Sequence, residues 1–496
     1  MNKNQSPPSP SPPLSLSFSL PLPLSPSLPH RLWRTALVVG VLLAAAYLGR
    51  RPSMRWLMLF AAGAGGLLLL RAPILGLYGI LGAALMARIV IATGTEVELN
   101  VATLLIPAVF LLWLVDRAGR RELHWANSRV DRPLLLFLLA GLIALLAGNV
   151  LWDPAVPKSG NFWLVQLAQW GIFAFAALAF WLVANMAQDA ARLEHLTWTF
   201  LFLGGGLAIL RVAPGIGPVV QRMATIAVDR APFWVLLTAL AGGQLLFNDN
   251  LTRGRRLFLF LVAGAIFIYA FIVLRENVSN WVGVAAVAGT LVWMRFVKLR
   301  GAIITVVVLL ILTGILFPSL YEFAGGDDEW TESGGSRLAL IERVIQVTMR
   351  NPITGLGPAS YRPYTSMEPL RYGNALWIVP KVNSHNNYVD IFAHTGLLGF
   401  GLFLWFMSEI GWLGWQRSTQ HRSGFAGGYA NGMFAAWAGS MVIMMFADWM
   451  LPFVYNIGFP GFQASLLVWL FFGGLVCVRG GEGEGESGGV GEGVRG

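Results

Sequence analysis

The sequence NSHNNYVDIFAHTGLLG, residues 383–399, joins a long polar segment to an apolar run. Its hydrogen-bonding side chains stand at the mouth of a predicted membrane helix. Polar groups are retained at such depth in a bilayer where they pair with one another, line a cavity or take part in chemistry. We therefore expect a membrane protein whose functional residues gather at the start of this helix.

The composition of the whole chain agrees with this interpretation. Of 496 residues, 56% are hydrophobic and 12% are charged, and the mean hydropathy is +0.63. Soluble domains carry about twice that share of charge. Apolar runs of about 17 to 25 residues recur from Arg34 onward without alternating, which favours helices over a barrel. The sequence predicts an all-α polytopic bundle of about 12 to 14 transmembrane helices with one large extracytoplasmic loop.

Composition also divides the chain into segments. Residues 1–30 are rich in Ser, Pro and Leu, and residues 479–496 are rich in Gly and Glu, so both ends are predicted to be disordered. Transmembrane helices are predicted over residues 34–317 and 385–478. The extracytoplasmic loop between them spans residues 318–384.

Basic residues indicate which connections face the cytoplasm. They crowd residues 117–132, 253–256 and 295–300, as expected for inner loops. Residues 211–230 and 275–280 then lie outside with the large loop. These loops account for the net charge of +10, so no nucleic-acid partner is predicted.

His385 is the candidate general base. Asn383 or Ser384 is predicted to cap a helix that starts at His385. In that first turn the helix dipole would lower the pKa of the imidazole, and a neutral imidazole can accept a proton.

Asn386, Asp390 and His394 follow at four-residue steps and share one face of the predicted helix. Asp390 and His394 are expected to pair with each other or to face a wet cavity. A buried Asp–His bond that only locks packing explains the pattern equally well. Gly396 and Gly399 predict close approach of a neighbouring helix.

Arginines on the outer side are candidates for binding an anion. Arg337 opens a predicted loop helix that ends at Met349 and is capped by Ser336. Arg275 stands at the outer membrane boundary, where an ordinary interfacial anchor is the alternative. Arg88, inside its predicted span, is a weaker candidate.

Three motifs in order resemble the O-antigen ligase and polymerase superfamily, over residues 335–406. They are Ser336-Arg337 with its helix, Asn351-Pro-Ile-Thr-Gly-Leu-Gly357, and His385-Asn-Asn-Tyr388 leading to Gly396-Leu-Leu-Gly399. The resemblance implies a GT-C-like architecture and a metal-independent reaction with no cofactor. It implies transfer of a glycan from an undecaprenyl-diphosphate carrier to a hydroxyl of a glycan, lipid or other acceptor. The site would lie on the outer face of the bacterial inner membrane.

The resemblance also assigns residues. It makes His385 the catalytic residue and Arg337 and Arg275 the ligands of the diphosphate. Beside these assignments, the residue pattern itself offers Asn386, Tyr388, Asp390, His394 and Arg88 as possible supporting residues. The sequence departs from the family pattern at Ile341, where members often have Trp, and at Ser279-Asn280, where they often have Ser-Arg.

A transporter or flippase of a lipid-linked glycan is the alternative function. Such a protein is expected to have inverted repeats and polar groups near the middle of the membrane. The sequence has no visible internal repeat, and its suggestive residues gather at the outer face. These features favour the enzyme, but they do not separate a ligase from a polymerase.

Overall fold

The structure of the protein, a computed structural model, describes residues 39–40, 63, 65–122, 124–274, 278–314, 335–372 and 375–478. The two termini predicted to be disordered and Arg275 lie outside these residues. The chain divides into residues 1–68 and residues 69–496. The arrangement described below is that of the second unit.

The elements from residue 75 to residue 312 are α3 (Leu75–Met86), β1 (Val90–Ala92), β2 (Glu98–Asn100), α4 (Val101–Gly119), α5 (Asp131–Val150), α6 (Phe162–Met186), α7 (Ala190–Val212), α8 (Gly217–Met223), η1 (Ile226–Asp229), α9 (Ala231–Phe247), α10 (Arg253–Ile268), η2 (Tyr269–Val273), α11 (Val278–Arg295), η3 (Val297–Leu299) and α12 (Arg300–Leu312). Those that follow are α15 (Gly335–Thr348), α16 (Tyr361–Thr365), β3 (Leu370–Tyr372), β4 (Ala375–Trp377), α17 (Asn387–Gln420), α18 (Gly424–Ile443) and α19 (Gly458–Cys477).

The all-α class is confirmed, and the protein is a multi-pass membrane protein. The described residues contain seven helices long and apolar enough to cross a membrane, or eight if α11 and the start of α12, bent by 104°, form one span. This number is below the prediction because apolar runs such as α3 and α9 form shorter helices, and the runs before residue 65 lie largely outside the described residues. The strands described form two small antiparallel hairpins, β1–β2 and β3–β4.

The core is centred on α19, which is buried along nearly its whole length. It packs against α6 and α9, and α9 packs in turn against α18. Gly243 of α9 makes that second contact close, because a Cβ there would lie 2.3 Å from the carbonyl oxygen of Gly428 in α18. Small residues commonly allow such close packing of membrane helices.

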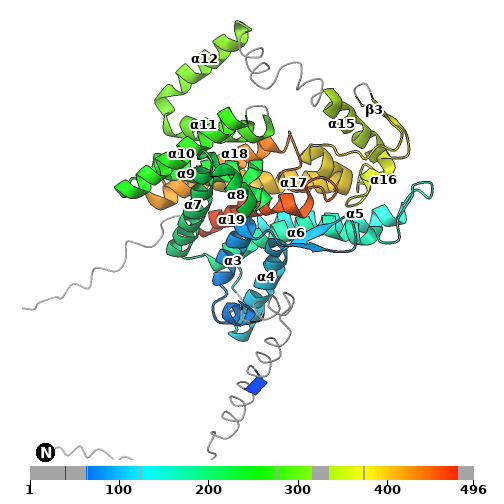
Figure 1. Cartoon of the computed structure of the whole chain (residues 1–496), viewed down its shortest axis with the longest axis horizontal. Helices are drawn as coiled ribbons and strands as arrows, with labels where there is room; N and C mark the ends of the chain where they lie inside the picture. The colour runs from blue at the N-terminus through cyan, green and yellow to red at the C-terminus, as the bar shows by residue number, and fades with distance from the viewer. Residues whose placement is uncertain are drawn as a thin grey trace, which may run out of the picture. The chain divides into compact units, whose positions relative to one another are not determined.

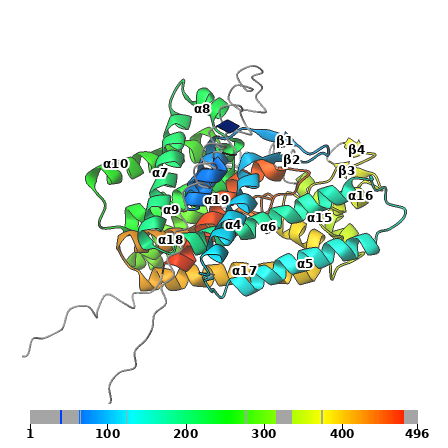
Figure 2. The ribbon, with the colours of Figure 1, turned by 90° about the horizontal axis from the view of Figure 1, so that it is seen from below.

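The segment between α12 and α17 forms a group of short elements at one end of the helices. Figure 1 shows α15, α16 and β3 together, and α15 contacts both α16 and α17. α17 then runs back along α5 (Figure 2). It is broken at Gly396, whose backbone is not helical (φ 64°, ψ −170°).

Candidate active site

A cavity of about 510 Å³ lies where several connections meet at this end of the helices. Its walls come from η1, η2, the first turn of α15, the residues before α17 and the connection from α18 to α19. His385 and Arg337 both line it, so the structure brings together two of the predicted site residues. The other charged residues that line it are Arg211, Asp229, Arg230 and Asp448.

His385 lies just before a helix rather than in its first turn. α17 begins at Asn387, and its N-cap is Asn386, whose side chain accepts backbone N–H groups at 3.0 and 3.2 Å. The predicted cap by Asn383 or Ser384 is therefore wrong. His385 has a left-handed backbone (φ 50°), which is uncommon for a residue that carries a Cβ.

The environment of His385 favours the neutral imidazole. Burial lowers its pKa from the usual value near 6.5, and the positive charge of Arg337 lowers it further. The predicted direction is confirmed. The cause differs from the predicted one, because His385 stands outside the helix whose dipole was expected to act.

Arg337 faces the cavity from α15. The helix begins at Gly335, so Ser336 lies inside it and is not its cap. One guanidinium nitrogen of Arg337 donates to the carbonyl oxygen of Phe446 at 3.3 Å. Among the described residues Arg337 forms no salt bridge, which leaves its charge available to a ligand.

Arg230 was not predicted, and it is a partly buried cation that lines the cavity. Its guanidinium lies 5.5 Å from the ring centre of Trp449, and its buried Nε has no hydrogen-bond partner among the described residues. Burial lowers the pKa of Arg230, although Asp229 and Asp448 oppose the shift. An unpaired guanidinium nitrogen in such a place is suited to a bound anion.

Arg211 was also missed, and its charge is already paired. Its Nε and Nη2 both donate to Oδ1 of Asp229 at 3.1 Å, and the hydroxyl of Tyr269 lies 3.4 Å from the same oxygen. The sequence did place residues 211–230 on the outer side. The sequence shows an arginine at each end of that connection, and this pattern could have identified Arg211 and Arg230 as candidates.

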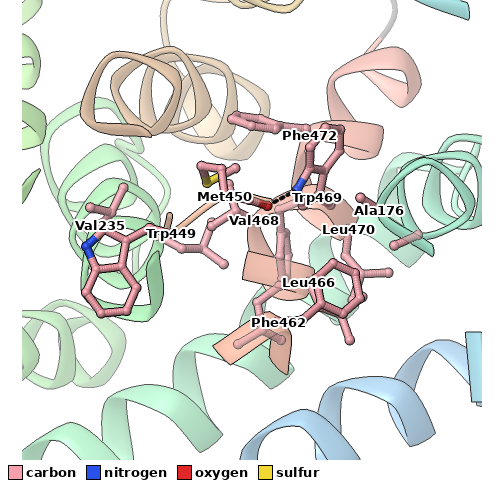
Figure 3. Close-up of a cluster of buried hydrophobic side chains, with 14 of the residues drawn as sticks. Ala176, Val235, Trp449, Met450, Phe462, Leu466, Val468, Trp469, Leu470 and Phe472 are labelled. Atoms are coloured by element: carbon pink, nitrogen blue, oxygen red, sulfur yellow. Dashed lines mark hydrogen bonds between the residues drawn. The ribbon is translucent and has the colours of Figure 1, made fainter. Parts of the chain in front are cut away.

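The wall of the cavity that the connection from α18 to α19 forms is anchored in the hydrophobic core. Trp449 lines the cavity and belongs to the buried cluster shown in Figure 3. In that cluster Trp469 of α19 donates to the carbonyl oxygen of Met450 at 3.0 Å. Asp448 accepts the backbone N–H of Phe453 at 2.7 Å. The connection from α18 to α19 is therefore held by a bond to α19 and by a bond within the connection itself.

Comparison with known families bears on this site. Residues 251–404 match the family described as O-antigen ligase. These residues form an O-antigen ligase domain. No curated protein matches the chain. The domain contains Arg337 and His385, whereas Arg211 and Arg230 precede it, so the cavity is completed by residues from outside the domain.

Within the O-antigen ligase domain, the turn of residues 351–357 docks into the break in α17. Leu356 N–H donates to the carbonyl oxygen of Ala393 at 2.9 Å, and Leu397 N–H donates to that of Pro352 at 2.8 Å. A Cβ on Gly396 would lie 2.2 Å from the carbonyl oxygen of Ile353. Gly396 therefore receives this turn rather than the neighbouring helix that we expected.

Asn386 and Tyr388 anchor the turn before α17. Besides capping the helix, Asn386 donates through Nδ2 to the carbonyl oxygen of Met445 at 3.1 Å. The hydroxyl of Tyr388 donates to that of Met441 at 2.8 Å. Both side chains are thus bonded to the end of α18 and the connection after it.

Asp390 and His394 do not pair. Asp390 Oδ1 accepts from the hydroxyls of Ser384 at 2.7 Å and Tyr361 at 2.8 Å. His394 stacks on Tyr361 with ring centres 5.3 Å apart. Among the described residues its ring nitrogens have no well-aligned hydrogen-bond partner, and the candidate partner is the backbone of Gly357. His394 is only 1% exposed, and the rings of Phe173 and Phe453 also lie against it. The prediction that it faces a wet cavity is therefore wrong.

The remaining arginine candidates differ in position. Arg88 lies beyond the end of α3 rather than inside a span, and its guanidinium donates to the carbonyl oxygens of Gln221 and Arg222. Arg275 lies outside the described residues, although its neighbour Leu274 lines the cavity.

Three other arginines of the large loop are bonded to groups outside the cavity. Arg343 donates to a carboxylate oxygen of Glu368 at 2.8 Å, and Arg350 to one of Asp153 at 2.6 Å. Arg362 donates to the carbonyl oxygen of Tyr455 at 3.1 Å. In the part of the chain that the structure describes, no group of three or more His, Cys, Asp or Glu side chains could hold a metal ion. Metal independence of the reaction stays a prediction.

Proposed function

We propose that this protein transfers or polymerises a glycan from an undecaprenyl-diphosphate carrier onto an acceptor hydroxyl at the outer face of the bacterial inner membrane. The observation that supports this most is that His385, Arg337 and Arg230 line one cavity of a protein with an O-antigen ligase domain. A base and two cations are what this substitution at a sugar carbon requires.

The cations have a defined task in the proposed reaction. The bond between the anomeric carbon and the diphosphate oxygen breaks, and the leaving diphosphate takes the electron pair. Arg337 and Arg230 stabilise the charge that develops there, because a guanidinium binds phosphate oxygens through parallel hydrogen bonds. Arg211 contributes less because Asp229 neutralises it. Arg275 remains a candidate for the same task.

The proposed role of His385 is to accept the proton of the acceptor hydroxyl as its oxygen bonds to the anomeric carbon. Its lowered pKa keeps the imidazole neutral near pH 7, as a base must be. The bilayer holds the lipid carrier beside the site, which supplies much of the proximity that the reaction needs.

Reconstituted vesicles provide the test. Purified protein is mixed with an undecaprenyl-diphosphate-linked glycan and an acceptor, and release of undecaprenyl diphosphate is measured. We expect release that depends on acceptor and is lost in His385→Ala. Movement of intact lipid-linked glycan across the bilayer without release would instead show a flippase.

A deletion strain then separates the two enzymatic alternatives. Full-length chains that stay on the carrier would identify a ligase, whereas single repeat units on the carrier would identify a polymerase.

A further inference from the structure

The backbone of His385 must be held in place by its surroundings. A left-handed conformation is unfavourable for a residue with a Cβ, and it persists where neighbouring contacts impose it. On one side of His385, Asn386 is fixed as the cap of α17 and by its bond to Met445. On the other side stands Ser384, which is fully buried.

Ser384 bridges the two sides of this turn. Its hydroxyl oxygen accepts the backbone N–H of Asn386 at 3.0 Å, and the hydroxyl donates to Oδ1 of Asp390 at 2.7 Å. The backbone N–H of Asp390 donates to the carbonyl oxygen of Asn386 at 3.0 Å. The carbonyl oxygen of Asn386 also lies 2.9 Å from the Ser384 hydroxyl, but the shorter contact is the one to Asp390. The carboxylate of Asp390 therefore links the turn that carries His385 to the first turn of α17.

Asp390 is committed to this bridge. It is 2% exposed, and among the described residues it forms no salt bridge. In the described part of the chain its Oδ2 has no hydrogen-bond partner, so its side-chain hydrogen bonds are made by Oδ1, which also accepts from Tyr361 at 2.8 Å. Tyr361 comes shortly after the turn of residues 351–357, so its hydrogen bond ties the carboxylate of Asp390 to the large loop.

We propose that Asp390 is a positioning residue that fixes His385 through Ser384 and so directs the imidazole into the cavity. This inference rests on the proposed function of His385 as the proton acceptor. The alternative is that Asp390 only satisfies two buried hydroxyls, in which case its loss would lower stability without altering His385.

Ser384→Ala tests the bridge, and Ser440→Ala is its matched control. Ser440 is also fully buried, but its hydroxyl has no hydrogen-bond partner among the described residues. In the transfer assay, turnover of Ser384→Ala should fall about 10- to 100-fold with KM little changed, because the base is misplaced rather than removed. Ser440→Ala should keep the wild-type turnover.

A second measurement does not depend on transfer. Diethyl pyrocarbonate modifies neutral imidazoles, and mass spectrometry gives its rate at His385 relative to the exposed His195. We expect this ratio to change in Ser384→Ala and not in Ser440→Ala. An unchanged ratio and unchanged turnover in a Ser384→Ala protein of lowered melting temperature would overturn the proposal.

Replacement of Asp390 by Asn and by Leu tests the acceptor oxygen. Asp390→Asn keeps an oxygen that both hydroxyls can bond and should retain most of the turnover, whereas Asp390→Leu should resemble Ser384→Ala. Equal loss in Asn and Leu variants, with the His385 modification ratio unchanged in both, would contradict the role of Oδ1. If wild-type protein fails to transfer at all, the proposed function fails, while the modification ratio still reports on positioning.

Discussion

His385 and His394 belong to the same short stretch of sequence and occupy opposite environments. His385 lines a cavity with Arg230 and Arg337, and its backbone is left-handed. His394 is fully enclosed, stacked between Tyr361 and other aromatic rings. One histidine is accessible to a molecule bound in the cavity, whereas the other is enclosed by packed side chains.

The difference arises from the chain between the two residues. Asn386 caps α17, so His385 lies outside the helix, while His394 lies within it and is buried in the core. At Gly396 the helix breaks and the turn of residues 351–357 enters, which seals His394 from that side. The following predictions test the comparison, from the largest expected effect to the smallest.

His385→Gly should have the largest effect on transfer. Loss of the base should lower the rate by about 10²- to 10⁴-fold. Because glycine adopts a positive φ without steric cost, the melting temperature should not fall. Transfer and melting temperature are measured on the same purified protein. A parallel loss of both would mean that His385 supports the fold rather than the reaction.

Arg337→Lys and Arg230→Lys should each lower turnover of the donor by about 10²-fold, since lysine keeps the charge but loses the planar fork. Arg343→Lys is the matched control, because Arg343 is held by Glu368 away from the cavity. It should lower thermal stability and leave transfer unchanged. Steady-state release of undecaprenyl diphosphate is measured for all three variants. Wild-type activity in both Arg337→Lys and Arg230→Lys would exclude these two arginines from diphosphate binding.

His394→Phe should change little. The ring stays aromatic and keeps its stacking, and among the described residues it loses only a poorly aligned contact with the backbone of Gly357. Removal of a buried polar group with so poor a hydrogen bond is expected to leave stability equal or raise it by about 1 kcal/mol. Transfer assays and thermal unfolding of this variant check the expectation. An inactive but stable His394→Phe protein would contradict this expectation, because it would show that transfer also needs the imidazole of His394.

The dependence of transfer on pH should show the smallest effect. Protonation of His385 stops it from accepting a proton, so activity should fall at low pH. Because the pKa of His385 lies below its usual value near 6.5, the loss should occur below that pH. Arg337→Gln removes one of the two causes and should move the midpoint upward. The remaining cause, burial, is the larger one, so the upward shift should be modest.

The arginines show where prediction from sequence reached its limit. The outer position of residues 211–230 was predicted from the distribution of charge. The roles of the individual arginines were not predictable, because Arg211 is paired within its own connection while Arg230 lies against Trp449 from the opposite end of the chain. Contacts between segments so far apart leave no local pattern.

The sequence by itself determined the membrane class and the O-antigen ligase motifs, and it named His385 and Arg337 as candidates before the cavity that they line was known. Hydrophobic run length, charge distribution and motif order are local properties, and they can be seen without the fold. Tertiary structure decided that Asp390 bonds Ser384 and Tyr361 rather than His394, and that Arg230 joins the cavity. These outcomes depend on which buried polar groups meet when distant helices pack, and helical spacing alone does not specify that.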